Sequence, residues 1–489
     1  MKYTLVIPTA TAATAIIEPV KPAMQRIANV LPNWLTREVV LAVAFTWLLV
    51  QMAVPFPVVV VVTPVFGLLG LLFLPLRQEE AGAERTVHAG FLLVIASIFF
   101  YGIGIVHSGG VLYRHNVRDL PGIAIALMLL LLTGSVSLDS ARNIYSKLSK
   151  YACIVATALC IVSIYKFAML LNGQELSWLV QFGENESHGT YPGGTSLNSD
   201  YNFYALFILI GLLSAAHLAL GARTSNRLRA FAILALPLLA VCVVLAGSRR
   251  AWTVFGLVAA YGIARLGIQL VLRRGLPKGT LTALACLCGM TVLTGAALIV
   301  NGRDVLDVLN STVVEALSSR FETLTGSDGT LVDSFSSRTD AWQYGINQIV
   351  PRYSPFQLLV GDGFGYLREY ARAFPFWQEE EDYPHNLVLS ALHYSGLLGA
   401  GVVAALLALP ILRTIYLRTA LTDFVWLVHI ILILFCLPSS NSIFNIYGHV
   451  ALLVFTVQIA IPKVSPTSSS PTPTTSPWKP TDTPTPAST

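Results

Sequence analysis

The feature that most constrains this chain is its series of long apolar runs. The runs "VVLAVAFTWLLVQMAV", "VVVVVTPVFGLLGLLFL" and "LPGIAIALMLLLLTG" approach the ~20 residues that a helix needs to cross a bilayer. Charged residues make up only 12% of the chain, about half the share in a soluble domain. Because backbone amides in lipid must be satisfied within the segment, we predict an all-α polytopic membrane protein.

The apolar runs predict about twelve transmembrane helices. They lie near residues 38–54, 57–76, 88–106, 119–136, 151–171, 202–221, 230–247, 251–271, 280–300, 387–411, 421–437 and 443–461. The domain organisation that follows is an N-terminal segment (1–37), helices one to nine (38–300), a loop domain (301–385), helices ten to twelve (386–462) and a Pro/Ser/Thr-rich tail (463–489), which we expect to be disordered.

The distribution of basic residues predicts the orientation. With the N-terminus inside, nineteen of the 31 lysines and arginines fall in cytoplasmic segments, as the positive-inside rule requires. Both termini are then cytoplasmic, and the loop 301–385 faces outward. This loop holds six arginines and thirteen acids, and patterns such as "TDAWQYGINQIV" predict that it is partly helical. In a transporter of the major facilitator type the long connection lies in the middle of the chain and on the cytoplasmic side. Here the long loop follows the ninth span and faces outward, which argues against that class.

Arginines mark two places where an anion could bind. Arg249 and Arg250 in "GSRRAW" interrupt an apolar region at the predicted outer end of a span, where charge is costly. Arg338 in "SSRTDAW" begins a predicted helix, where a cation opposes the macrodipole unless an anion lies between them. One guanidinium group can donate two parallel hydrogen bonds to the oxygens of a phosphate. The alternatives are interfacial arginines that reach headgroups, and an ion pair of Arg338 with Asp340.

The junction "EEEDYPHNLVLSALHYSGLLG" holds the candidate base. Asn386 can cap the helix that follows, and His385 can take a proton because imidazole titrates near neutral pH. The alternative is that His385 is only a capping or interfacial residue. His393 could share a face with it two turns later, but no carboxylate completes a metal site, and the acidic run is more typical of a solvated segment than of a calcium site.

Other sequence features predict neither a metal site nor a cofactor. The six cysteines all fall in apolar runs without ligand spacing. The glycines of "LLVGDGFGYL" predict a tight turn with close backbone approach, not a dinucleotide site. The net charge of +5 follows from the loops, so it indicates no nucleic-acid partner.

These motifs resemble the O-antigen ligase/polymerase superfamily of bacterial envelope glycosyltransferases. The resemblance lies in "GSRRAW", in "SSRTDAWQYGINQI" with "LLVGDGFGYL", and above all in the spacing from His385 and Asn386 to Gly396 and Gly399. "TSLNSDYNFYALFIL" also resembles the segment that precedes the first arginine block. The resemblance covers about residues 190–460. One departure is Trp342, four residues after the loop arginine, where the family often has leucine.

The resemblance implies a GT-C-like membrane enzyme in the bacterial inner membrane with its active site facing the periplasm. It implies an O-antigen ligase that moves a glycan from undecaprenyl pyrophosphate to a sugar hydroxyl of lipid A–core, with inversion and without a metal or cofactor. His385 would be the base, and Arg249 and Arg338 would bind pyrophosphate. Arg250 competes with Arg249 for this role, and Arg249 is preferred. Asn386 and Trp342 would support them. We expect Trp342, Tyr370, Phe376 and Trp377 to stack on sugars.

Two alternatives stay open. A polymerase of O-antigen or exopolysaccharide, or a protein O-oligosaccharyltransferase, would use the same donor with another acceptor. A polysaccharide exporter belongs to a different class and predicts a charge-lined central path, whereas the charges here gather at the outer rim.

Overall fold

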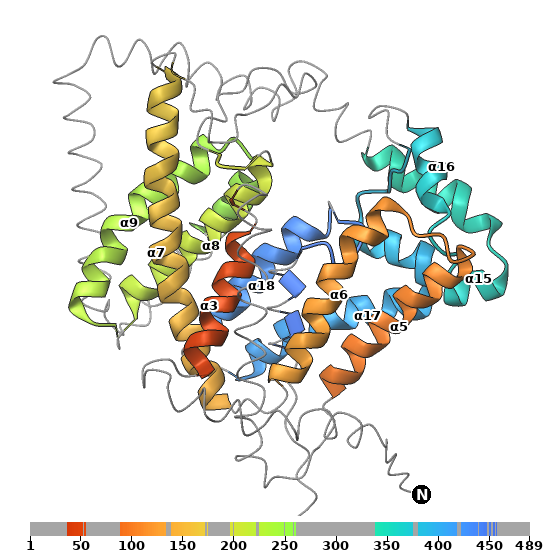
Figure 1. Cartoon of the computed structure of the whole chain (residues 1–489), viewed down its shortest axis with the longest axis horizontal. Coiled ribbons are helices and arrows are strands. Elements are labelled where there is room, and N and C mark those ends of the chain that lie inside the picture. The colour runs from red at the N-terminus through yellow and green to blue at the C-terminus, as the bar shows by residue number, and fades with distance from the viewer. Residues whose placement is uncertain are drawn as a thin grey trace, which may run out of the picture.

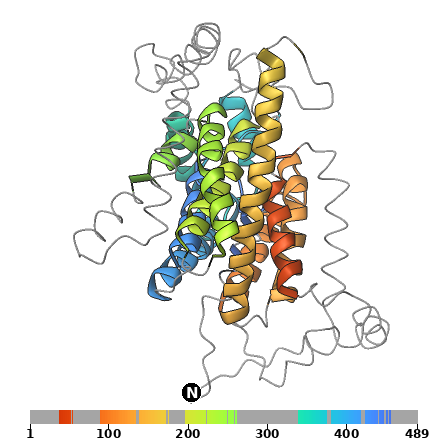
Figure 2. The same cartoon turned by 90° about the vertical axis from the view of Figure 1, so that its left-hand side faces the viewer.

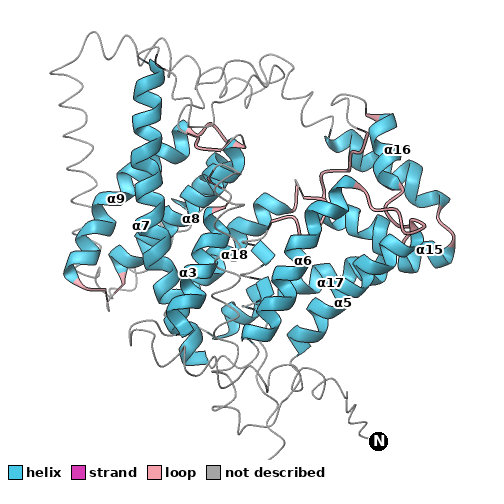
Figure 3. Ribbon diagram, viewed as in Figure 1, coloured by secondary structure: helices cyan, strands magenta, loops and turns pink. Residues whose placement is uncertain are grey.

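A computed structural model of the chain describes most of the predicted membrane region and part of the predicted loop domain. The described residues are 37–51, 53–54, 89–133, 138–171, 174, 196–198, 200–221, 224–248, 250–257, 259–260, 338–374, 380–417, 422–438, 440–446, 449–450, 453–454 and 456. Every regular element within them is a helix (Figure 3). The all-α prediction is therefore confirmed for the part of the chain that the structure describes.

Four of the described helices are long and apolar enough to cross a membrane. Their membrane-compatible portions are Ser140–Met169, Tyr201–Leu220, Asn226–Leu245 and Leu387–Leu412. They coincide with predicted spans near 151–171, 202–221, 230–247 and 387–411. Since a helix of this length and composition is stable in lipid rather than in water, the chain is a membrane-embedded protein.

One group of helices packs side by side around the longest helix, α7 (Figures 1 and 2). Small residues allow close approach, as where Gly211 of α8 lies against Ala156 of α7. Helix α7 begins well before the predicted span. The prediction missed its first turns because they carry polar residues, which a hydropathy pattern does not assign to a span. The group comprises α3 (Arg37–Val50), α7 (Leu138–Leu171), α8 (Tyr201–Leu220) and α9 (Asn226–Leu245).

A second group contains the described part of the predicted loop domain, on the right of Figure 1. Helix α18 packs against both α17 and α8, so it joins this group to the first. The group comprises α5 (Ala89–His107), α6 (Arg114–Thr133), α15 (Pro355–Val360), α16 (Tyr366–Ala373), α17 (Leu387–Leu417) and α18 (Thr422–Cys436).

The remaining predicted spans are described only in part or not at all. The spans near 57–76 and 280–300, the segment 1–36, residues 301–337 and the tail 463–489 lie outside the described residues. The predicted span near 443–461 begins late, because residues 443–446 are not helical and the next described helical residues are 449–450.

Helix α17 is broken at Gly396. Its φ of 65° and ψ of −168° are open only to glycine, and a Cβ there would lie 2.4 Å from the carbonyl carbon of Leu359. The segment 387–395 is therefore a separate helical piece, and an unbroken helix runs from Leu397 to Leu417.

An aromatic core holds the described loop residues against α5 and α17. The rings of Phe364 and Tyr394 stack with centroids 4.9 Å apart, and Tyr101 packs against both. The predicted glycine turn precedes this core: Gly361 and Gly363 have φ of 91° and 85°. The turn lets the backbone approach α5 and α17 closely, as the sequence predicts.

Candidate functional site

The segment 380–386 is fixed in place by contacts with other elements. The indole of Trp342 donates to the carbonyl of Pro384 over 2.7 Å, and the amide of Asp382 donates to the carbonyl of Leu367 over 3.0 Å. These contacts come from the helix at 338–344 and from α16, so the folded loop domain sets the course of this segment. Trp342 thus supports the site by holding backbone, and its indole N–H is already engaged.

The cap predicted at Asn386 is present. Its side-chain oxygen accepts from the amides of Val388 and Leu389, each over 3.1 Å. The amide of Leu387 donates to the carbonyl of Leu437 over 2.9 Å, at the end of α18. The first turn of α17 is therefore tied to the chain that follows α18.

The acidic run is more than a solvated segment. The carboxylate of Glu381 accepts from the amides of Arg114 and His115 over 3.0 and 3.3 Å, at the start of α6. A carboxylate at a helix N-terminus accepts from free amides and interacts favourably with the positive end of the macrodipole. The interpretation as a purely solvated run is wrong for Glu381, which instead ties this segment to α6.

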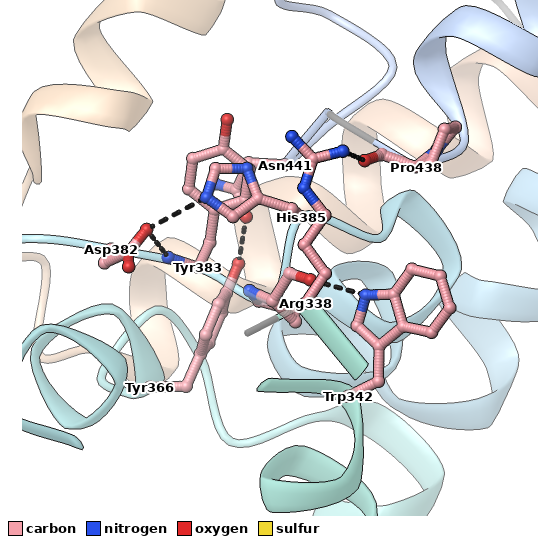
Figure 4. Close-up of polar contacts among 9 residues, drawn as sticks. Arg338, Trp342, Tyr366, Asp382, Tyr383, His385, Pro438 and Asn441 are labelled. Carbon is pink, nitrogen blue, oxygen red and sulfur yellow. Dashed lines mark hydrogen bonds and ion pairs between the residues drawn. The ribbon is translucent and has the colours of Figure 1, made fainter. Parts of the chain in front are cut away.

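His385 lies at the centre of the segment in an unusual backbone conformation. It is the one described non-glycine residue with positive φ, at 50°. Its Nε2 lies 3.4 Å from the Oδ1 of Asp382, and its ring lies on that of Tyr383 with centroids 4.3 Å apart (Figure 4). A left-handed conformation costs about 1–3 kcal/mol and is characteristic of functional sites. The strain turns the imidazole back over its own segment.

Arg338 reaches the same place from the helical stretch 338–344. Its guanidinium donates to the carbonyl of Pro438 over 3.4 Å and lies beside His385 and Tyr383 in Figure 4. Arg338 is the first described residue of a helical stretch that continues to residue 344, and residues 331–337 lie outside the described residues.

Arg250 approaches from the first group of helices. It begins a helical stretch at 250–257, close to Asp200, which caps α8 through the amides of Asn202 and Phe203. Burial lowers the pKa of Arg250, and the neighbouring Asp200 carboxylate opposes that shift. Burial likewise raises the pKa of Asp200. Arg249 lies outside the described residues, so Arg250 is the arginine of this pair whose position is known.

Tyr383 is the residue on which these groups converge. Burial and the Asp382 carboxylate raise the pKa of its phenol, while the charges of Arg250 and Arg338 act in the opposite direction. Both guanidinium charges therefore act on one phenol, whose ring is tilted by 41° against that of His385. Sequence reasoning missed this tyrosine, although it stands two residues before His385 in "DYPHN". Its only sequence signal was that proximity.

Two predicted roles do not fit the structure. His393 is fully buried, and its ring nitrogens lie 2.8 Å from the hydroxyl of Tyr353 and 3.3 Å from that of Tyr370. His393 is thus a core residue that does not share a site with His385. Tyr370 is also fully buried and donates to the carbonyl of Ala341, so its ring is not available to a sugar. Phe376 and Trp377 lie outside the described residues.

The arrangement can bind an anion and accept a proton. Two guanidinium groups and a phenol supply donors for phosphate oxygens, and an imidazole paired with a carboxylate can act as a base. No group of three or more metal-ligating side chains occurs within the described residues. The sequence predicted His385 and Arg338, and it preferred Arg249, which lies outside the described residues, over Arg250. The charges of Arg250 and Arg338 both act on Tyr383, whose ring contacts that of His385. The sequence did not indicate Asp382 or Tyr383. A scan against protein-family models and a search of curated proteins found no match to this chain.

Proposed function

We propose that this protein is a glycosyltransferase of the O-antigen ligase type, which uses a glycan on undecaprenyl pyrophosphate as donor. The observation that carries the proposal is that the charges of Arg250 and Arg338 both act on Tyr383, whose ring contacts that of His385. These residues lie up to 135 positions apart in the sequence. Sequence motifs that resemble one enzyme family would be scattered if the resemblance were accidental.

The site offers a direct displacement mechanism. His385 takes the proton of an acceptor hydroxyl while the oxygen of that hydroxyl attacks the anomeric carbon of the donor sugar. The bond from that carbon to the phosphate oxygen breaks, and its electron pair leaves with the pyrophosphate. Attack from the face opposite the leaving group inverts the anomeric centre. Arg250 and Arg338 stabilise the charge that develops on the phosphate, so the arginines supply the positive charge that a metal ion supplies in other transferases.

Asp382 and Tyr383 have defined parts in this mechanism. The Asp382 carboxylate orients the imidazole of His385 and stabilises the imidazolium that forms, as carboxylates do in other histidine-dependent enzymes. The Tyr383 phenol donates a hydrogen bond to the phosphate between the two guanidinium groups. Its ring contact with His385 keeps the base next to the leaving group.

The proposal includes the finer topology. Twelve helices in a GT-C-like arrangement, with both termini in the cytoplasm, put every segment of the site on the periplasmic side of the inner membrane. Helix ends near residues 113–119, 200, 250, 387 and 437 all contribute to or contact the site. In the predicted topology all of these ends lie on one side of the membrane, which supports a site built from segments on a single side.

Lipid A–core is the proposed acceptor. One experiment distinguishes this function from the alternatives. The purified protein is placed in vesicles with a lipid-linked glycan and offered lipid A–core, a second donor molecule or a protein acceptor. A ligase glycosylates lipid A–core. A polymerase lengthens the lipid-linked glycan, and an oligosaccharyltransferase modifies the protein. Movement of intact donor across the bilayer without a new glycosidic bond would indicate an exporter and overturn the proposal.

The same assay tests the assigned residues. His385→Ala should lose at least about 100-fold in turnover with unchanged donor affinity, because it lacks the base. Arg250→Ala and Arg338→Ala should weaken donor binding and slow transfer, and chelator should have no effect. Arg352→Ala is the matched control, since this arginine is exposed and pairs with Glu369. Full activity in His385→Ala would contradict the mechanism.

A further inference from the structure

The short helix α15 presents an apolar face to the outside of the molecule. Phe356 and Leu359 are 65% and 46% exposed, although they belong to the segment predicted as a hydrophilic loop. We call these two residues the α15 face. Large apolar side chains gathered on one exposed surface mark a contact with a membrane or another protein.

The α15 face lies where two apolar helices end or break. A Cβ at Gly396 would be 2.5 Å from the carbonyl oxygen of Leu359, so α15 packs on the break in α17. The Nδ1 of His107, the last residue of α5, lies 3.0 Å from the carbonyl oxygen of Gly361, and its ring is 6.2 Å from that of Phe356. Figure 1 shows α15 beside the end of α5.

The exposed apolar surface continues from α15 onto these helices. Val106 at the end of α5 is 72% exposed, and Leu397 and Leu398, directly after the break in α17, are 54% and 45% exposed. Leu397 and Leu398 belong to a helix that is long and apolar enough to span a membrane, and exposed apolar residues of such a helix face hydrocarbon. The α15 face therefore extends a lipid-facing surface.

The backbone at the ends of α15 suits a medium without water. Ser354 and Gln357 form a capping box, with distances of 2.9 and 3.3 Å, and Pro355 has no amide hydrogen to satisfy. At the other end the amide of Gly361 donates to Gln357 over 2.7 Å. Satisfied polar groups at both ends lower the cost of bringing this short helix to the membrane surface.

We propose that the α15 face inserts into the bilayer and contacts the acyl chains of membrane lipids. It anchors the loop segment between Arg338 and His385 to the membrane surface. The inference depends on the membrane setting of α17 and is independent of the proposed reaction, so it can hold even if the protein is not a transferase.

Photocrosslinking in vesicles tests the anchor. The photoreactive residue p-benzoylphenylalanine replaces Phe356 in the full-length protein, which is reconstituted in phosphatidylethanolamine and phosphatidylglycerol, irradiated and analysed by mass spectrometry. We expect a phospholipid adduct at position 356. The same probe at Leu398 is the positive control, and at Arg352, whose side chain is 59% exposed on the preceding turn, it should capture at least ten-fold less lipid.

Three results would overturn the proposal: an adduct between two copies of the chain, an adduct with another segment of the same chain, or no lipid at 356 while 398 captures it. Placing the probe at Leu359 repeats the test if the first variant does not fold, because both residues belong to the same face.

Discussion

At the scale of single residues, the site depends on the conformation of one histidine. His385 has φ of 50°, which directs its ring onto Tyr383 and toward Asp382. The sequence indicates a histidine at a helix start and predicts the Asn386 cap, because both follow from local chemistry. It does not indicate the partners of His385, since a left-handed residue reverses the side-chain direction that an extended segment would give.

The backbone strain at His385 predicts different stabilities for two inactive variants. A residue with a side chain is destabilised by about 1–2 kcal/mol in the left-handed conformation. This cost is larger than the stability that glycine loses because its unfolded chain has more conformational entropy. His385→Gly should therefore be more stable than His385→Ala by up to about 1 kcal/mol. Denaturant unfolding in detergent, followed by tryptophan fluorescence, measures the difference. A more stable alanine variant would show that the segment relaxes when the imidazole is absent.

The pairing with Asp382 predicts a loss of turnover without a loss of binding. Asp382→Asn removes the charge that orients and stabilises the imidazolium, so kcat should fall at least about ten-fold while donor affinity stays unchanged. Steady-state kinetics in vesicles separates the two quantities. Glu380→Gln is the matched control, because this acid is exposed two residues earlier. An equal loss in both variants would indicate a general charge effect and not a specific pair.

At the scale of elements, the sequence predicts where helices lie better than where they break. Hydropathy locates α8, α9 and α18 to within a few residues. It misses the first turns of α7, because polar residues there continue the helix. It also misses the break in α17, since a glycine in an apolar helix is more often a packing residue than a break. The break can be recognised only in the structure, where the backbone of Leu359 packs against Gly396.

The break predicts opposite effects for two glycine substitutions in α17. Gly396→Ala should destabilise the protein by more than about 3 kcal/mol, because its Cβ would meet backbone atoms and its φ excludes side chains. Gly401→Ala should stabilise it by up to about 1 kcal/mol, since nothing lies within 4 Å and alanine favours a helix. Thermal unfolding in detergent tests both. Equal effects would mean that α17 tolerates a continuous helix.

At the scale of the whole molecule, the site forms where the two groups of helices meet. Arg250 follows α9 and lies close to Asp200, the cap of α8 in the first group, whereas Arg338 and His385 belong to the second group. The sequence predicts that these segments share a side of the membrane, because the alternation of spans and basic loops determines sidedness. It does not predict which loops touch, since that depends on how helices pack across the bundle.

The proposed orientation predicts the location of reporters. Alkaline phosphatase, which is active only after export, should be active when fused after Phe374. It should be inactive when fused after Leu417, where a fluorescent protein that folds only in the cytoplasm should be bright. Enzyme activity and fluorescence in intact bacteria measure this. The reverse pattern would put the site on the cytoplasmic side and exclude a periplasmic transferase.

The break at Gly396 also has a consequence for how related chains can be recognised. Between Asn386 and Gly396 the chain is helical, so each inserted or deleted residue would rotate His385 by about 100° and move it ~1.5 Å relative to the docked α15. The number of residues between the His-Asn pair and this glycine is thus fixed by the helix geometry. Chains that share this chemistry should conserve the interval even where their loops differ in length.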